Sequence, residues 1–149
     1  MKALLVEDDE FKAASVRGVV KNMRPNSQFI NANTVHSAVS SLQSGEFDLI
    51  MLDMALPSHQ LRPGSGPTSS LLSGGLEVIM ELSYLKRFDP VIILTQFPEL
   101  EVEGDLVALK KAKEVLRTHY NANVIAVIHY RHEQQEWQDS LIQEMNKIL

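Results

Sequence analysis

Cysteine is absent from the 149-residue sequence, which excludes disulfide bonds and metal sites built from thiolates. Basic residues are also too few to dominate: 14 lysines and arginines stand against 19 aspartates and glutamates, giving a formal net charge of −5. A protein whose main task is to grip a phosphate backbone needs a basic face. We therefore expect no direct binding of nucleic acid.

Long hydrophobic runs are missing as well. The first ten residues, MKALLVEDDE, hold only a short apolar run before four consecutive acidic residues, which is not the pattern of a signal peptide. No other segment is long enough to span a bilayer, so we expect no membrane insertion. The hydrophobic and charged fractions, 44% and 22%, are those of an ordinary globular protein. Together these features predict a cytoplasmic protein with a single domain over residues 1–149.

Short apolar runs alternate with helical patterns along the chain. The runs are rich in aliphatic side chains, which favours strands buried on both faces. They cover residues 3–6, 49–52, 91–94 and 124–128, with a weaker run around 29–30. Apolar spacings of three and four predict helices over about 16–23, 35–43, 76–85, 106–116 and 137–148. This order predicts an α/β fold with a doubly wound, five-stranded parallel sheet. The strand order that we expect for this sheet is 2-1-3-4-5, one of the common doubly wound orders.

One segment interrupts this regular order. Residues 58–74 have neither helical nor strand periodicity, and ten of these seventeen residues are glycine, proline or serine. Such a composition predicts a long loop insertion within the fold.

Acidic side chains follow two of the predicted strands. Glu7, Asp8 and Asp9 come after the first strand, and Asp53 comes directly after the third. In a sheet of the predicted order these strands are neighbours, and ligands bind beyond their carboxyl ends. Carboxylates gathered at one point repel one another unless a cation is present, and oxygen ligands suit Mg²⁺, which favours a phosphoryl group nearby. The pattern thus predicts a magnesium site with a phosphoryl group beside it.

A second interpretation applies to some of these acids. Carboxylates that follow a strand often cap the next helix, where they suit its dipole. We expect this local role for Asp9 and Glu10. The joint placement of Glu7, Asp8 and Asp53 is better explained by the metal.

Four stretches of the sequence, taken in order, carry a resemblance to a known family. They are ALLVEDDE, DLIMLDMALP, GGLEVIM and PVIILTQF. They resemble, respectively, the acidic pocket, the phosphate-accepting strand, the start of the third helix and the fourth strand of response regulator receiver domains in two-component signalling. Each motif is modest alone, but together they cover nearly the whole chain at about the expected spacing. The resemblance implies the flavodoxin-like receiver fold.

The resemblance also implies a role for each site residue. Asp53 would accept a phosphoryl group from a phosphohistidine and become an acyl phosphate. The implied cofactor is Mg²⁺, held by Asp8 and Asp53, by Glu7 directly or through water, and by the backbone carbonyl of Ala55. Thr95 would turn its hydroxyl to the phosphoryl group; the alternative is that it caps the segment that follows.

The sequence departs from the family pattern at the fifth strand. Receivers normally carry a lysine there, followed by proline, and its ammonium pairs with the phosphoryl group. Here the strand runs NVIAVIHYRH, and the position falls on Ile128, His129 or Tyr130 depending on the register. Arg131 is not an equivalent substitute, because its planar fork differs from a compact ammonium. This departure puts the efficiency of phosphorylation in question.

Two functions follow from these observations. The first is a stand-alone phosphorelay receiver, phosphorylated by a sensor histidine kinase or phosphotransfer protein, that signals through contacts with a downstream protein effector; a homodimer is left open. We expect no enzymatic activity beyond self-phosphorylation and autodephosphorylation at Asp53. The alternative is a pseudo-receiver, a binding or adaptor module that phosphorylation does not regulate. The missing lysine favours the alternative, and the intact acidic residues oppose it.

Overall fold

The computed structural model describes residues 1–57 and 74–148 and contains a parallel sheet of five strands. The strands are β1 (Lys2–Val6), β2 (Gln28–Ala32), β3 (Leu49–Leu52), β4 (Val91–Thr95) and β7 (Val124–His129). They lie in the order β2-β1-β3-β4-β7. Because β5 and β6 belong to a separate hairpin, β7 is the predicted fifth strand. The predicted fold class and strand order are confirmed.

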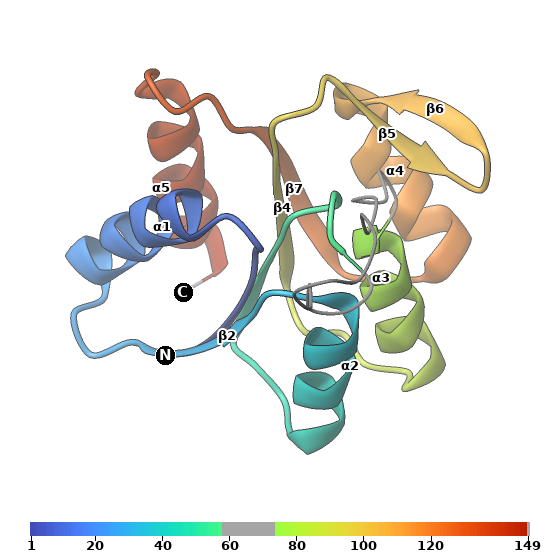
Figure 1. The fold of residues 1–149 in the computed structure, drawn as a ribbon, viewed down its shortest axis with the longest axis horizontal. Coiled ribbons are helices and arrows are strands. Elements are labelled where there is room, and N and C mark those ends of the chain that lie inside the picture. Colours follow the sequence, from blue (N-terminus) through green and yellow to red (C-terminus); the bar gives the residue numbers. More distant parts are fainter. Residues whose placement is uncertain (58–73, 149) are drawn as a thin grey trace, which may run out of the picture.

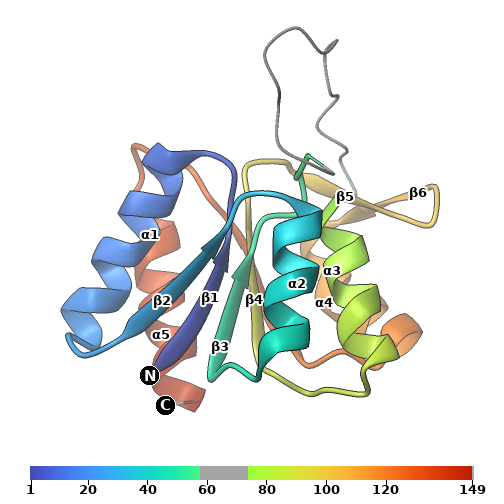
Figure 2. The ribbon, with the colours of Figure 1, turned by 60° about the horizontal axis from the view of Figure 1, so that its bottom comes forward.

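Helices cover both faces of this sheet, as Figures 1 and 2 show. One layer consists of α1 (Glu10–Met23) and α5 (Glu136–Ile148); the other consists of α2 (Val35–Ser44), α3 (Gly74–Tyr84) and α4 (Leu109–Tyr120). Successive residues of a strand point to opposite faces. Thus Leu49 and Met51 of β3 pack in the core with α1 and α5, whereas Ile50 and Leu52 pack in the other core. This double burial explains why β3 is apolar throughout.

The chain between β4 and α4 forms an antiparallel hairpin that the sequence pattern did not predict. Strand β5 (Glu99–Val102) pairs with β6 (Asp105–Ala108). The two residues that connect them, Glu103 and Gly104, have φ angles of 51° and 86°, which are typical of tight hairpin turns. The helix predicted over 106–116 is wrong in its first turn, because Leu106 lies in β6 with 65% of its surface exposed and α4 begins at Leu109.

The loop insertion predicted over residues 58–74 lies outside the described residues, except for Gly74. This residue is the first of α3, so the predicted boundary is one residue too far along the chain. Gly75 follows it and donates its backbone N–H to the carbonyl oxygen of Met54 (2.8 Å). A Cβ on Gly75 would lie only 2.6 Å from the carbonyl oxygen of Asp53, so glycine lets α3 approach the end of β3 closely.

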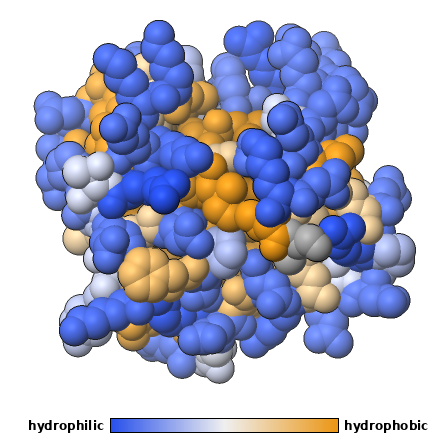
Figure 3. Space-filling model, turned by 180° about the vertical axis from the view of Figure 1, so that it is seen from behind, coloured by the Kyte–Doolittle hydropathy of each residue, from blue (hydrophilic) through white to orange (hydrophobic). Residues whose placement is uncertain are grey.

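The surface of the molecule is mostly polar on the face seen from behind. Figure 3 shows hydrophilic residues over most of this face, with the hydrophobic residues gathered in a central band.

Strand β7 forms one edge of the sheet, and its middle residues Ile125, Ala126 and Val127 remain half-buried. None of the helices in the described ranges is both long and apolar enough to cross a membrane.

Candidate functional site

Glu7 and Asp53 lie side by side because the strands that carry them are neighbours. Strand β1 ends at Val6 and β3 at Leu52, and these two residues are opposite one another in the parallel pair. The next residue of each strand therefore leaves the sheet at the same place. Both Glu7 and Asp53 are buried there.

Asp8 completes a group of three carboxylates at this point. One carboxylate oxygen from each of Glu7, Asp8 and Asp53 lies within 4.8 Å of the other two. Within residues 1–57 and 74–148, no other set of three or more acidic, histidine or cysteine side chains gathers in this way. Asp8 is exposed, so the group opens to solvent on one side. The structure thus brings together the three carboxylates that were predicted as metal ligands.

Asp9 and Glu10 have local roles in α1. Asp9 is the N-cap, and its Oδ1 accepts hydrogen bonds from the backbone N–H groups of Phe11 (2.9 Å) and Lys12 (3.2 Å). Glu10 lies in the first turn, where it is exposed and pairs with Arg17. Neither residue belongs to the group of three carboxylates.

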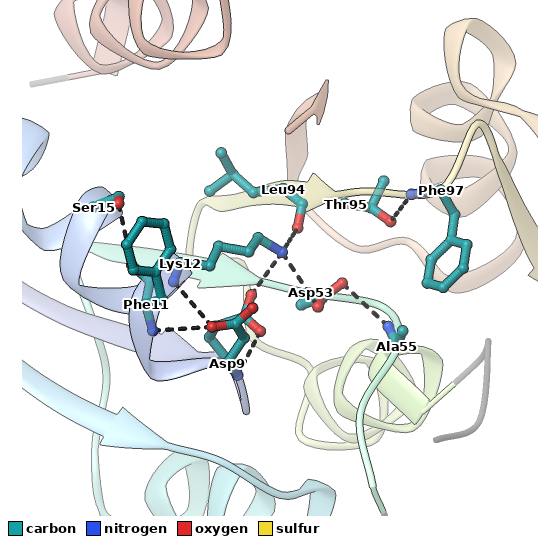
Figure 4. A network of polar contacts seen from close by, with 10 residues as sticks. Asp9, Phe11, Lys12, Ser15, Asp53, Ala55, Leu94, Thr95 and Phe97 are labelled. Atoms are coloured by element: carbon teal, nitrogen blue, oxygen red, sulfur yellow. Dashed lines mark hydrogen bonds and ion pairs between the residues drawn. The ribbon is translucent and has the colours of Figure 1, made fainter. Parts of the chain in front are cut away.

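A lysine that the sequence pattern did not predict as a site residue lies in the middle of the carboxylates. The side chain of Lys12 enters from α1 and is 1% exposed. Its Nζ lies 2.6 Å from Oε2 of Glu7 and 3.2 Å from Oδ2 of Asp53, and it donates to the carbonyl oxygen of Leu94 at 2.7 Å. Figure 4 shows the ammonium group between Asp53 and Leu94. An ammonium has three N–H donors, and each has one partner here.

The sequence does contain a signal for Lys12. The buried face of α1 is formed by Lys12, Ala13, Val16, Val19 and Val20. Lys12 lies one helical turn before Val16, in phase with this apolar stripe, so its position alone predicts a side chain that points into the molecule. A lysine at such a position needs a buried partner.

Three carboxylates and one ammonium leave this pocket with an excess of negative charge. Burial, followed by the charge of Asp53, raises the pKa of Glu7 from 4.5 to about 8, although Lys12 opposes both effects. Burial also raises the pKa of Asp53 above its usual range, again against the charge of Lys12. A cation bound beside the carboxylates would favour their charged forms.

The backbone that follows Asp53 is held close to its side chain. Oδ1 of Asp53 accepts a hydrogen bond from the backbone N–H of Ala55 (3.2 Å), and Ala55 is buried. Gly75 at the start of α3 stabilises this turn by donating its backbone N–H to the carbonyl oxygen of Met54. Ala55, the predicted backbone ligand, therefore lies next to the acidic group.

The position of the family's fifth-strand lysine falls at the end of β7, on Ile128, His129 or Tyr130. His129 is opposite Thr95, and the backbone N–H of Tyr130 donates to the carbonyl oxygen of Thr95 (2.7 Å). Tyr130 is buried, and the centre of its ring lies 5.3 Å from Nζ of Lys12. Arg131 is exposed. The end of β7 therefore places an aromatic ring, rather than a cation of its own, beside the Lys12 ammonium.

Thr95 ends β4 and is fully buried. Its Oγ1 accepts a hydrogen bond from the backbone N–H of Phe97 (3.2 Å), so the hydroxyl caps the following turn, as in the alternative interpretation. Figure 4 shows the Thr95 side chain turned towards Phe97.

Comparison with known proteins gives relatives for most of the chain. No family model matches the sequence. The chain is 33% identical over 131 residues to the Detocs response regulatory protein DtcB of Vibrio alginolyticus, which covers 87% of this chain and 88% of that protein.

Solved structures share the fold. The phosphorylated cyanobacterial phytochrome response regulator RcpA has a TM-score of 0.67 at 17% identity, covering 99% of this chain and 92% of that one. The Mn²⁺-bound response regulator Rcp1 has a TM-score of 0.63 at 21% identity, covering 94% and 88%. From its sequence relative and its fold together, the chain belongs to the response regulator receiver family.

Proposed function

We propose that this protein is a phosphorelay receiver in which Asp53 accepts a phosphoryl group beside a bound Mg²⁺ ion. One observation supports this most strongly: Asp53 is a buried carboxylate within 4.8 Å of the carboxylates of Glu7 and Asp8, and it pairs with Lys12. A nucleophilic carboxylate needs positive charge around it when it attacks a phosphoryl group.

The donor atoms in the pocket suit a hard divalent cation. Asp8 is exposed and is the direct ligand that we propose, together with Asp53 and the backbone carbonyl of Ala55. Each oxygen of Glu7 already accepts one bond, from Lys12 and from the backbone N–H of Asp9 (3.0 Å) respectively, and we propose that Glu7 reaches the ion through water. When bound, Mg²⁺ supplies positive charge that orients the phosphoryl oxygens and stabilises their developing charge.

The chain's own residues carry the transfer step as follows. An ionised Asp53 oxygen attacks the phosphorus of a phosphohistidine; the new P–O bond forms as the P–N bond breaks. The imidazole nitrogen leaves with the bonding electron pair and takes up a proton from solvent. Thr95 then rotates its hydroxyl from the Phe97 N–H to a phosphoryl oxygen. The added charge biases the loops around the site and thereby the surface that partners contact.

The partners that we propose follow from this chemistry. A sensor histidine kinase or a phosphotransfer protein donates the phosphoryl group, and a downstream protein effector responds to the modified receiver. The response regulatory relative and the phosphorylated receiver of similar fold support this assignment. We further propose that residues 1–149 act as one cytoplasmic receiver domain.

Phosphorylation can be tested by intact mass spectrometry. The protein is incubated with Mg²⁺ and acetyl phosphate, beside Asp53→Asn and the matched control Asp105→Asn, which changes an exposed aspartate of β6. We expect the mass of one phosphoryl group on the parent and on the control, and none on Asp53→Asn. An unmodified parent that also fails to respond to beryllium fluoride would contradict the proposal and favour a module that phosphorylation does not regulate.

A further inference from the structure

We propose that Lys12 of α1 pairs with the phosphoryl group on Asp53 and so performs the task for which β7 offers no lysine. This inference rests on the proposed phosphorylation of Asp53. It concerns a residue on a different element from the one where the family pattern places its lysine. The contacts of Lys12 Nζ with Glu7, Asp53 and Leu94 support this inference.

The ammonium of Lys12 lies where three strands end. Its three partners are Glu7, the residue after β1; Asp53, the residue after β3; and the carbonyl oxygen of Leu94, the penultimate residue of β4. Among the ion pairs of the described residues, Lys12 is the one cation that contacts the acidic group. Within residues 1–57 and 74–148, no other ion pair brings a positive charge to Asp53.

Stability alone does not explain a lysine at this place. The rest of the buried stripe of α1 is apolar, and a methionine or leucine would fill the same volume. Replacing a buried ion pair by well-packed apolar residues is often neutral or stabilising, because both charges must be desolvated. A charge kept at 1% exposure is better explained by what it does to Asp53.

The contacts of Lys12 also allow it to follow the charge. When Asp53 becomes an acyl phosphate, the carboxylate loses its negative charge, and the charge moves to the phosphoryl oxygens. The 3.2 Å contact with Asp53 Oδ2 is the longest of the three and is the one released. Leu94 and Glu7, at 2.7 and 2.6 Å, hold the ammonium in place while it donates to a phosphoryl oxygen instead.

The end of β7 presents the ring of Tyr130, and not a second cation, to the ammonium of Lys12. This ring fills the end of β7 beside the ammonium, at 5.3 Å from Nζ, where the ring face attracts a cation. The ring of Tyr130 and the ammonium of Lys12 thus lie side by side at the end of β7. The exchange of Tyr130 for lysine is a natural way to test whether the ammonium, rather than the helix that carries it, is what the site requires.

The test compares Lys12→Met with Lys21→Met, which removes an exposed lysine of the same helix. Single-turnover phosphorylation by acetyl phosphate is followed by intact mass at saturating Mg²⁺, and Mg²⁺ affinity is measured separately by titration calorimetry. We expect Lys21→Met to match the parent and Lys12→Met to react about 10²-fold more slowly, the loss typical of removing one donor to a developing charge. Mg²⁺ should bind Lys12→Met at least as tightly as the parent, because a competing cation has been removed.

The outcomes separate the inference from the proposed function. A phosphorylated parent with an equally fast Lys12→Met would overturn the role of Lys12 and leave Asp53 as the acceptor. A parent that is not phosphorylated would overturn both. If Lys12→Met does not fold, as judged by circular dichroism, Lys12→Gln takes its place with the same expected outcomes.

A second variant distinguishes the charge of Lys12 from its packing. Lys12→Met combined with Tyr130→Lys returns an ammonium to the pocket from the end of β7. We expect its phosphorylation rate to lie between those of Lys12→Met and the parent. A folded double variant that binds Mg²⁺ and remains as slow as Lys12→Met would contradict the claim that the site needs an ammonium at this point.

Discussion

Without divalent cations, the stability of this protein should fall as the pH rises from about 5 to about 8, because Glu7 is buried. In the folded state burial, together with the charge of Asp53, raises the Glu7 pKa to about 8, whereas the unfolded chain releases the same proton near pH 4.5. The folded state therefore binds more protons across this range. The contribution of Glu7 is fully present below pH 4.5 and is lost as the pH passes through 8.

The size of the effect follows from the two pKa values. A difference of one pKa unit between two states corresponds to about 1.4 kcal/mol, so a rise from 4.5 to about 8 amounts to at most about 5 kcal/mol. The pKa of Asp53 is also raised, which acts in the same direction. Mg²⁺ should reverse the loss at pH 8, since a ligand at 100 times its Kd stabilises the folded state by about 2.7 kcal/mol.

Urea unfolding followed by circular dichroism can measure this dependence. The free energy of unfolding is determined between pH 5 and about pH 8.5, once with a chelator and once with saturating Mg²⁺. Glu7→Gln is the matched variant, because it cannot ionise and should give a flatter profile. A parent whose stability is constant or rises with pH in the chelator, or one that Mg²⁺ does not stabilise at pH 8, would refute the reasoning.

Three further changes probe other parts of the molecule by urea unfolding. Gly75→Ala puts a Cβ 2.6 Å from the carbonyl oxygen of Asp53, so we expect a loss of about 1–3 kcal/mol and weaker Mg²⁺ binding. Burial alone would raise the pKa of Asp89, but hydrogen bonds, chiefly from Arg87, hold this pKa below 3.8. The ionised Asp89 therefore stabilises the folded state above pH 3.8, and this stabilisation is lost in acid. Asp89→Asn should therefore cost about 1–3 kcal/mol at neutral pH and little below the folded pKa, and equal losses would contradict this. Leu106 is exposed on β6, so Leu106→Ser should change the free energy of unfolding by less than about 0.5 kcal/mol. A larger loss would show that the Leu106 side chain makes a stabilising contact.

The sheet could be predicted because its strands are buried on both faces. Leu49–Leu52 form an unbroken apolar run, and the alternation of such runs with helical patterns predicts a parallel sheet. The acidic group could be predicted for the same reason, since neighbouring parallel strands deliver Glu7 and Asp53 to one edge. The placement of these carboxylates depends on topology rather than on side-chain detail.

The hairpin β5–β6 was harder to predict because its spacing also fits a helix. Leu106 lies three residues before Leu109, as in the helix that follows, although it is part of a strand. A stronger signal was the alternation of Leu100 and Val102, which are both buried, before Gly104. Local spacing alone does not distinguish the end of a short strand from the first turn of the next helix.

Lys12 could not be assigned from apolar periodicity because it is charged. Its phase with the buried stripe of α1 indicates the direction of its side chain but not its partner. The partner depends on how closely α1 packs against the ends of β1, β3 and β4, which only the three-dimensional structure reveals. The fold brings the end of β7, which carries no lysine, next to Lys12 of α1, and this proximity is what the sequence alone does not reveal.

A crystal structure with Mg²⁺ and beryllium fluoride bound would measure whether Lys12 meets the group on Asp53. We expect beryllium on an Asp53 carboxylate oxygen, one of its fluorides about 2.7–3.2 Å from Nζ of Lys12, and the Leu94 carbonyl still accepting from the same ammonium. Beryllium fluoride bound to Asp53 with Lys12 turned away from it would contradict the role given to this lysine, and no binding at Asp53 would contradict the phosphorylation site itself.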